Sequence, residues 1–285
     1  MGVTGLTLGE GGTPLLEAPR LSERLGCELW LKWEGANPTG SFKDRGMALA
    51  VSRALEGGAP GVVCASTGNT AASAAAYAAR AGLPAVVLLP DGAVASSKIA
   101  QAAAAGAELR QLAGSFEDVH REARRLAENE GWINVNSINP DRIEGQSSAA
   151  VEIVQQLGSA PDVLALPYGG GGNTCAYALG FERSGAGRPR LLAVQSGQRA
   201  ETVASAIRIV EPVHREQAEA AAEVVTVGDD ELVEWWRAIA RLEGLFCEPA
   251  SAAGVAGVAR TRAGGRVVCV LTGHGLKDPD AVDLL

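Results

Sequence analysis

Short runs rich in β-branched residues alternate with alanine-rich stretches along most of this chain of 285 residues. The runs predict strands at 61–65, 85–89, 108–112, 133–136, 163–166, 191–195, 224–227 and 267–271. The intervening stretches predict helices at 69–81, 96–105, 115–130, 144–157, 174–184, 229–243 and 249–262. Continuously apolar strands that alternate with helices are typical of an α/β fold with mainly parallel sheets covered on both faces. In such folds ligands bind beyond the carboxyl ends of the strands, so polar residues there are candidate site residues.

Composition and charge narrow the class of protein further. Hydrophobic residues make up 47% of the chain and charged residues 20%, which is typical of a globular protein and not of a disordered one. The net charge of −8 argues against nucleic acid or an anionic membrane surface as a partner. We find no apolar run long enough to span a membrane and no signal-like N-terminal stretch, so we expect a cytoplasmic protein.

The cysteines and histidines carry no metal or disulfide pattern. The five cysteines are scattered without a C-x-x-C pair and are expected to be reduced core residues. The three histidines share no ligand spacing, so no metal is expected.

Lys43 follows a run of turn formers, Asn37-Pro-Thr-Gly-Ser-Phe, and precedes a stretch of helical composition over 47–55. At a helix start the macrodipole disfavours the protonated amine, which would make Lys43 nucleophilic enough to form a Schiff base. The alternative is a lysine whose ammonium lies in water.

Two further segments join a predicted strand to a predicted helix. Ser66-Thr-Gly-Asn-Thr70 brings hydroxyls, an amide and helix N–H groups together, which suits a carboxylate or another anion; the alternative is an ordinary capping turn. Gly169-Gly-Gly-Gly-Asn173 follows Tyr168, and its consecutive glycines suit a loop whose N–H groups wrap a phosphate. It matches neither the G-x-G-x-x-G nor the Walker pattern.

Two other segments end strands. Thr272 closes the last strand, where its hydroxyl is a neutral hydrogen-bond partner, although the segment could be a plain turn. Asn136, Ser137 and Arg142 bring an amide, a hydroxyl and a guanidinium together, which could hold a phosphate. The alternative for Arg142 is a surface pairing with Asp141 or Glu144.

Taken together, these segments resemble threonine synthase, a pyridoxal-phosphate enzyme family of the tryptophan-synthase β superfamily (fold type II). The resemblance runs from Glu10-Gly-Gly-Thr-Pro-Leu15 to Leu276-Lys-Asp-Pro279 and includes Phe246-Cys-Glu-Pro-Ala-Ser-Ala252. It implies two open, twisted, mainly parallel sheets flanked by helices, with the active site in the cleft between two domains. These would be a large cofactor domain, 1–45 with 136–285, and a small inserted domain, 46–135. It also implies a homodimer.

The resemblance assigns roles to individual residues. Lys43 would carry pyridoxal 5'-phosphate as a Schiff base and move protons, Asn69 would bond the ring hydroxyl, and Thr272 would meet the ring nitrogen. The cofactor phosphate would lie on Gly169, Gly170, Gly171, Gly172 and Asn173. The substrate carboxylate would lie on Ser66, Thr67 and Thr70, and the substrate phosphate on Asn136, Ser137 and Arg142.

The implied reaction is a β,γ-replacement that converts O-phospho-L-homoserine and water into L-threonine and phosphate. Three departures from the family pattern stand out: Gly170 where an amide is usual, Ser147 where a lysine is common, and a short stretch at 196–204. They leave open a related enzyme, such as a threonine or serine dehydratase or a β-replacing synthase acting on O-phosphoserine. A non-catalytic binding protein of the same fold is the alternative from another class.

Overall fold

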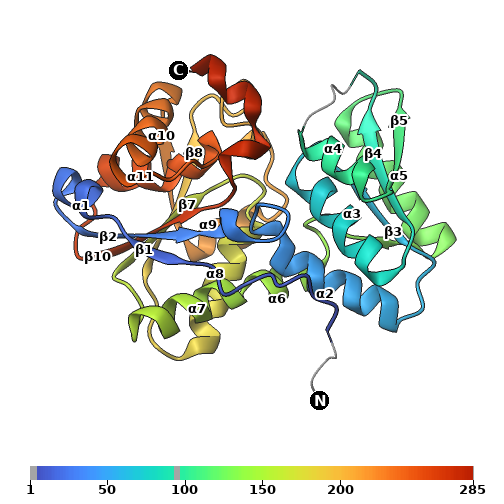
Figure 1. Cartoon of the computed structure of the whole chain (residues 1–285), viewed down its shortest axis with the longest axis horizontal. Coiled ribbons are helices and arrows are strands. Elements are labelled where there is room, and N and C mark those ends of the chain that lie inside the picture. The colour runs from blue at the N-terminus through green and yellow to red at the C-terminus, as the bar shows by residue number, and fades with distance from the viewer. Residues whose placement is uncertain (1–4, 93–96, 285) are drawn as a thin grey trace. The chain divides into compact units, whose positions relative to one another are not determined.

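The computed structural model describes residues 5–92 and 97–284, and the chain forms two compact units (Figure 1). Unit 1 comprises Met1–Glu10 and Lys43–Gly145, and unit 2 comprises Gly11–Phe42 and Gln146–Leu285. The functional domains expected from the sequence, 1–45 with 136–285 and 46–135, stay a prediction.

Unit 2 is built on a six-stranded sheet with the strand order β1-β2-β10-β7-β8-β9. Its strands are β1 (Leu15–Glu17), β2 (Glu28–Trp33), β7 (Val163–Pro167), β8 (Arg190–Ser196), β9 (Glu223–Val227) and β10 (Arg266–Leu271). Every neighbouring pair is parallel except β1 with β2. The carboxyl ends of β10 and β7 therefore lie at the same edge of the sheet.

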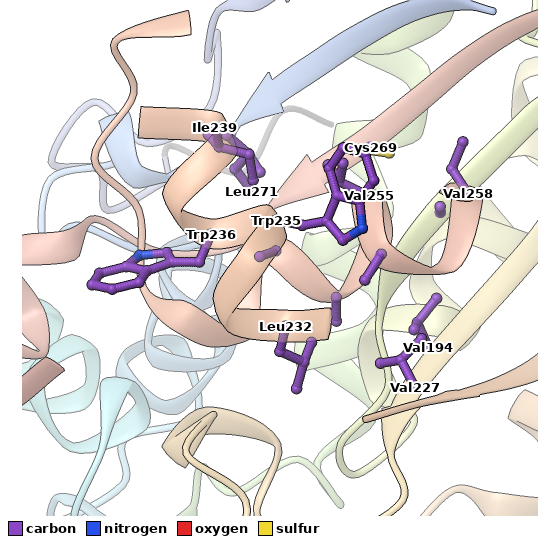
Figure 2. Packing of buried hydrophobic residues seen from close by; sticks show 14 of the residues in the cluster. Val194, Val227, Leu232, Trp235, Trp236, Ile239, Val255, Val258, Cys269 and Leu271 are labelled. Carbon is purple, nitrogen blue, oxygen red and sulfur yellow. The ribbon is translucent and has the colours of Figure 1, made fainter. Parts of the chain in front are cut away.

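Alternate residues of these strands enter two different hydrophobic clusters, as expected of a sheet covered on both faces. Val267 and Cys269 of β10 pack with helices α10 and α11, whereas Val268 and Val270 pack with α7 and α8. Figure 2 shows part of the first cluster, where side chains of α10 and α11 meet the strands. The helices of unit 2 are α1 (Pro19–Leu25), α7 (Ser148–Leu157), α8 (Gly172–Ser184), α9 (Arg215–Ala221), α10 (Asp229–Glu243) and α11 (Ala253–Thr261).

Unit 1 contains a parallel four-stranded sheet with the order β5-β4-β3-β6. Alternation again divides the strands: Val62 and Cys64 pack with α2, α3 and α4, and Val63 and Ala65 pack with α5. Its strands are β3 (Val62–Ala65), β4 (Ala85–Pro90), β5 (Glu108–Leu112) and β6 (Ile133–Asn134). Its helices are α2 (Lys43–Glu56), α3 (Asn69–Ala81), α4 (Ser97–Ala104), α5 (Phe116–Glu130) and α6 (Pro140–Gln146).

Most predicted elements are confirmed within one or two residues, and the start expected at Ser96 lies outside the described residues. Two expected helices are wrong as single elements. The stretch 144–157 divides into α6 and α7 at Ser147, within a glycine- and serine-containing run that favours helix weakly. The stretch 249–262 begins with a 3-10 helix, Pro249–Ala252, and only then becomes α11.

The stretch 196–223, which has the least strand character, holds a 3-10 helix (Ser205–Ile207) and α9. None of the helices over residues 5–92 and 97–284 combines the length and apolar character needed to cross a bilayer.

Candidate functional site

In unit 1, candidate residues gather at the carboxyl ends of β3 and β6, which are neighbouring parallel strands. Ser66 follows β3, and Asn136 follows β6 after Val135, whose N–H donates to the Val63 carbonyl at 2.9 Å. The Asn136 side chain extends this pairing, because its Oδ1 accepts from Ala65 N and its Nδ2 donates to Ala65 O, both at 2.9 Å. Asn136 thus fixes the point at which the Ser66–Thr70 turn leaves the sheet.

The Ser66–Thr70 turn leads directly into α3. Gly68 is the N-cap residue, and Asn69 is the first residue of the helix. Ser66 is buried, and its Oγ accepts from Gly68 N at 3.1 Å, whereas Thr67 is exposed. The hydroxyl proton of Ser66 and the first N–H groups of α3 are the donors that such a turn offers to an anion.

Lys43 is the first residue of α2, as predicted, and is half-buried. The next residue, Asp44, is fully buried and accepts a hydrogen bond from Ser73 Oγ of α3 at 2.7 Å. Met47, one turn later, belongs to the core of unit 1. The lysine is therefore attached to a helix start that is held in place by the two residues that pack behind it.

Arg142 is buried, with 1% of its surface exposed, so the surface alternative for this residue is wrong. Its Nη1 donates to Val135 O at 2.6 Å and its Nη2 to Lys43 O at 3.4 Å. Its Nε is buried without a hydrogen-bond partner in the described part of the chain. Burial lowers the pKa of Arg142 to about 10. The two Nη atoms of this guanidinium thus donate to backbone carbonyls, whereas its Nε–H remains available as a hydrogen-bond donor. Ser137, beside Asn136, is half-buried.

In unit 2 the tetraglycine loop follows β7 and passes into α8, which begins at Gly172, two residues before the predicted start. Gly171 adopts φ +87°, and a Cβ there would lie 3.1 Å from the Cβ atoms of His214 and Ala218. The N–H of His214 donates to Gly170 O at 3.0 Å. Any other residue at position 171 would have a strained backbone and a Cβ too close to His214 and Ala218, which accounts for glycine at this position.

The first turn of α8 has features of an anion site. Asn173 Nδ2 and Thr174 Oγ1 are buried, and neither has a hydrogen-bond partner among the residues that the structure describes. Buried polar atoms are normally paired, so two such donors at the N-terminus of a 13-residue helix fit a phosphate that would accept from them.

Thr272 follows β10, the neighbour of β7. Its carbonyl accepts from Phe42 N at 3.0 Å, and its Oγ1 lies 3.2 Å from the hydroxyl of Ser251. Thr272 is 5% exposed and Ser251 is fully buried. The sequence motifs taken singly give no role to Ser251, although it lies in the 246–252 stretch that carries the family resemblance.

The structure thus groups the candidate residues in two sets. One set, in unit 1, comprises Lys43, Ser66, Thr67, Asn69, Thr70, Asn136, Ser137 and Arg142. The other set, in unit 2, comprises Gly169, Gly170, Gly171, Gly172, Asn173 and Thr272.

One depression in the surface lies outside both sets of candidate residues. This depression, of about 710 Å³, has Glu28, Asp162 and Arg266 in its lining, at the amino ends of β2, β7 and β10. It contains none of the candidate residues. Over residues 5–92 and 97–284, no three His, Cys, Asp or Glu side chains form a group that could hold a metal ion.

Comparison with known proteins defines the class. The family model described as "Pyridoxal-phosphate dependent enzyme" matches residues 6–273. Maize serine racemase has the same fold, with a TM-score of 0.84 at 22% identity over 95% of this chain and 90% of that one. The chain is therefore a pyridoxal-phosphate-dependent enzyme of fold type II.

Two relatives define the family more narrowly. The threonine synthase of Synechocystis sp. is 49% identical over 302 aligned residues, which cover 96% of this chain and 79% of the relative. That of Mycobacterium leprae is 48% identical, with coverage of 97% and 85%. The chain belongs to the threonine synthase family and is a lyase. Both alignments are longer than 285 residues, so these relatives contain segments that this chain lacks.

Proposed function

We propose that this enzyme converts O-phospho-L-homoserine and water into L-threonine and phosphate, with pyridoxal 5'-phosphate as cofactor. The proposal is supported by the high identity to threonine synthases and by the two anion-binding features. One is the helix start at Asn173 and Thr174 in unit 2, and the other is the buried guanidinium of Arg142 in unit 1.

The cofactor would be held by groups whose chemistry matches its parts. The loop from Gly169 to Asn173, with the buried donors of α8, would hold the phosphate. Asn69 would bond the ring hydroxyl, Thr272 would meet the ring nitrogen, and the amine of Lys43 would hold the aldehyde carbon covalently. When bound, pyridoxal phosphate supplies an electron-withdrawing ring that stabilises negative charge on the substrate.

The substrate would be held by residues of unit 1. Ser66, Thr67 and Thr70, with the N–H groups of α3, would hold its carboxylate. Arg142 would hold its phosphate through the guanidinium edge that contains the unpartnered Nε, with Ser137 beside it. Asn136 would act mainly through the turn that it fixes, because its amide oxygen and its amide nitrogen are each bonded to Ala65.

Lys43 would move the protons of the reaction. Its Nζ would take the proton from Cα of the substrate and then one from Cβ. The bond between Cγ and the phosphate oxygen breaks, phosphate leaves, and Cγ receives a proton to become the methyl group. Water would then supply hydroxide to Cβ and its remaining proton to the departing phosphate, while Nζ would return its two protons, one to Cγ and one to Cα, so that the product is L-threonine. Arg142 would hold the leaving group throughout.

A comparison of three substrates tests the proposal. The purified enzyme with added cofactor should release phosphate from O-phosphohomoserine and form threonine in equal amounts. It should turn over O-phosphoserine and threonine far more slowly. Phosphate release from O-phosphoserine alone, or deamination of threonine alone, would replace the proposal by one of the related reactions.

We also propose a homodimer in a reducing, cytoplasmic compartment. All five cysteines are free, which fits a protein that depends on no disulfide. The dimer rests on the family resemblance. Light scattering coupled to size-exclusion chromatography would give a mass of twice 29.2 kDa if it is correct, and 29.2 kDa if it is not.

A further inference from the structure

Ser251 makes a small buried network with the residues that end strand β10. Its Oγ accepts from Gly273 N at 3.1 Å and lies 3.2 Å from Thr272 Oγ1. A third neighbour, the Gly273 carbonyl, is 3.4 Å away. The serine is fully buried, so water does not compete for these bonds.

The available donors and the distances favour one direction for these hydrogen bonds. A serine hydroxyl has one proton to give and lone pairs that can accept. Gly273 N–H already donates to Ser251, which leaves the Ser251 proton for either Thr272 Oγ1 or Gly273 O. The Gly273 carbonyl is the more distant of the two and already accepts from Glu248 N at 3.0 Å. The shorter distance and the unshared lone pairs of the threonine hydroxyl favour Thr272 Oγ1 as the acceptor of the Ser251 proton.

Cys247 does not alter this result. Its side chain also contacts Ser251, and burial raises the pKa of the Cys247 thiol. The sulfur therefore stays protonated, and because a thiol sulfur is only a weak acceptor it competes poorly for the Ser251 proton.

Since Thr272 accepts from Ser251, its own hydroxyl proton must point to another group. Its backbone is fixed by the bond from Phe42 N to Thr272 O, and within the described part of the chain its hydroxyl bonds Ser251 alone. We propose that Ser251 is a positioning residue that makes the Thr272 hydroxyl a hydrogen-bond donor. Thr272 would then donate to the pyridine nitrogen of the cofactor, which would be unprotonated. This inference rests on the proposed contact of Thr272 with the cofactor ring.

The consequence is chemical. A ring nitrogen that accepts a hydrogen bond carries no positive charge and withdraws electrons less strongly than a pyridinium. The chain of neutral groups from Gly273 N–H through Ser251 to Thr272 would therefore set the electronic state of the cofactor. A charged group beside it is Glu248, whose buried side chain lies against Gly273. If Ser251 were lost, the Thr272 hydroxyl could rotate, and a protonated nitrogen could donate to it.

Nitrogen-15 magnetic resonance of the holoenzyme, reconstituted with ring-labelled cofactor, tests this directly. We expect the wild-type resonance to be that of a neutral pyridine, and the S251A resonance to move toward the protonated form and vary with pH. S196A is the matched control, because Ser196 is also a buried, hydrogen-bonded serine of unit 2 but bonds Asp229 instead. A protonated nitrogen in the wild type, or the same resonance in all three proteins, would overturn the proposal.

A double-mutant cycle separates positioning from general damage. S251A should lower kcat up to about tenfold, as loss of one buried hydrogen bond would, and should have little further effect in a T272V background. Equal effects in both backgrounds would show that Ser251 does not act through Thr272. If S251A fails to fold by circular dichroism, S251C keeps the volume with a weaker donor and is judged by the same criteria.

The outcomes also distinguish this inference from the proposed function. A wild-type protein that takes up no cofactor would refute both. Normal cofactor uptake and threonine formation, with a nitrogen resonance that ignores Ser251, would refute the inference alone.

Discussion

The side chain of Asn136 accepts a hydrogen bond from Ala65 N and donates one to Ala65 O, each at 2.9 Å. The residue therefore acts as one further rung of the β3–β6 pair, beyond the last residues that pair through their backbones. Ser66 follows Ala65 directly, so the geometry of the Ser66–Thr70 turn depends on this rung.

Asn136→Ala would leave the N–H and carbonyl groups of Ala65 buried without partners. We expect it to lower the free energy of unfolding by about 1–3 kcal/mol and to raise KM for the substrate. Urea denaturation and steady-state assays measure both effects. Asn129→Ala, at an exposed position of α5, is the control and should change neither. A stable Asn136→Ala protein with a raised KM would show that Asn136 contacts substrate directly.

Arg142→Ala is expected to raise KM for O-phosphohomoserine by roughly 10- to 100-fold, because hydrogen bonds to a charged group contribute about 1.5–3 kcal/mol. Cofactor affinity should change much less. Arg53→Ala is the matched control: Arg53 belongs to the same unit and pairs with Asp141 and Glu144 at the surface. If KM were unaltered in Arg142→Ala, Arg142 would not bind the substrate, and its role would be limited to the hydrogen bonds that it makes to Val135 O and Lys43 O.

Helices α7 and α8 approach closely at Gly180. A Cβ there would lie 2.2 Å from Ser147 O and 2.7 Å from Ala150 Cβ, and a backbone oxygen cannot move aside easily. Gly180→Ala should therefore destabilise the protein by about 1–3 kcal/mol through overpacking. Gly264→Ala, with open space around its Cβ and no positive φ, should be tolerated. Thermal unfolding that gives equal midpoints for the two variants would contradict the close approach of the two helices.

His120 provides a test by pH. Burial and, secondarily, the charge of Arg124 lower the pKa of His120 from its ordinary value of 6.5. Just below pH 6.5 the unfolded chain thus binds more protons than the native protein, so stability should rise with pH there and level off above 6.5. His120→Gln should remove this part of the slope in urea denaturation between about pH 5 and 7. An unchanged slope would show that His120 titrates normally in the folded protein.

The sequence predicts those elements whose local signals agree with their surroundings. The helix start at Lys43 is confirmed by α2, and that at Ser115 by a capping box in which Ser115 and Asp118 exchange hydrogen bonds. Strand β2 escapes prediction because Glu28 and Lys32 interrupt its apolar pattern. Lys32 is nevertheless fully buried, and its amine donates to Thr13 O, Glu152 and Gln156, which lie 19, 120 and 124 residues away from it in the sequence.

The same limit applies to the site. Turn composition predicts Lys43 and the tetraglycine loop, because glycines and helix starts are recognisable in the local sequence. The hydrogen-bond partners of a side chain are not recognisable in this way. Nothing local shows that the Asn136 amide would bond Ala65, or that Ser251, 21 residues before Thr272, would lie 3.2 Å from its hydroxyl. These relationships depend on strand order, which brings distant segments together.

The central claim is that Lys43 holds the cofactor covalently, and borohydride reduction tests it most directly. The sequence contains four lysines, Lys32, Lys43, Lys98 and Lys277, so the pyridoxyl group that reduction fixes to the protein can be assigned among four side chains. Peptide mass spectrometry of the reduced holoenzyme should find the pyridoxyl group on Lys43, and Lys43→Ala should bind cofactor without becoming labelled or turning over substrate. A label on another lysine, or no label on a protein that is active with added cofactor, would contradict the claim.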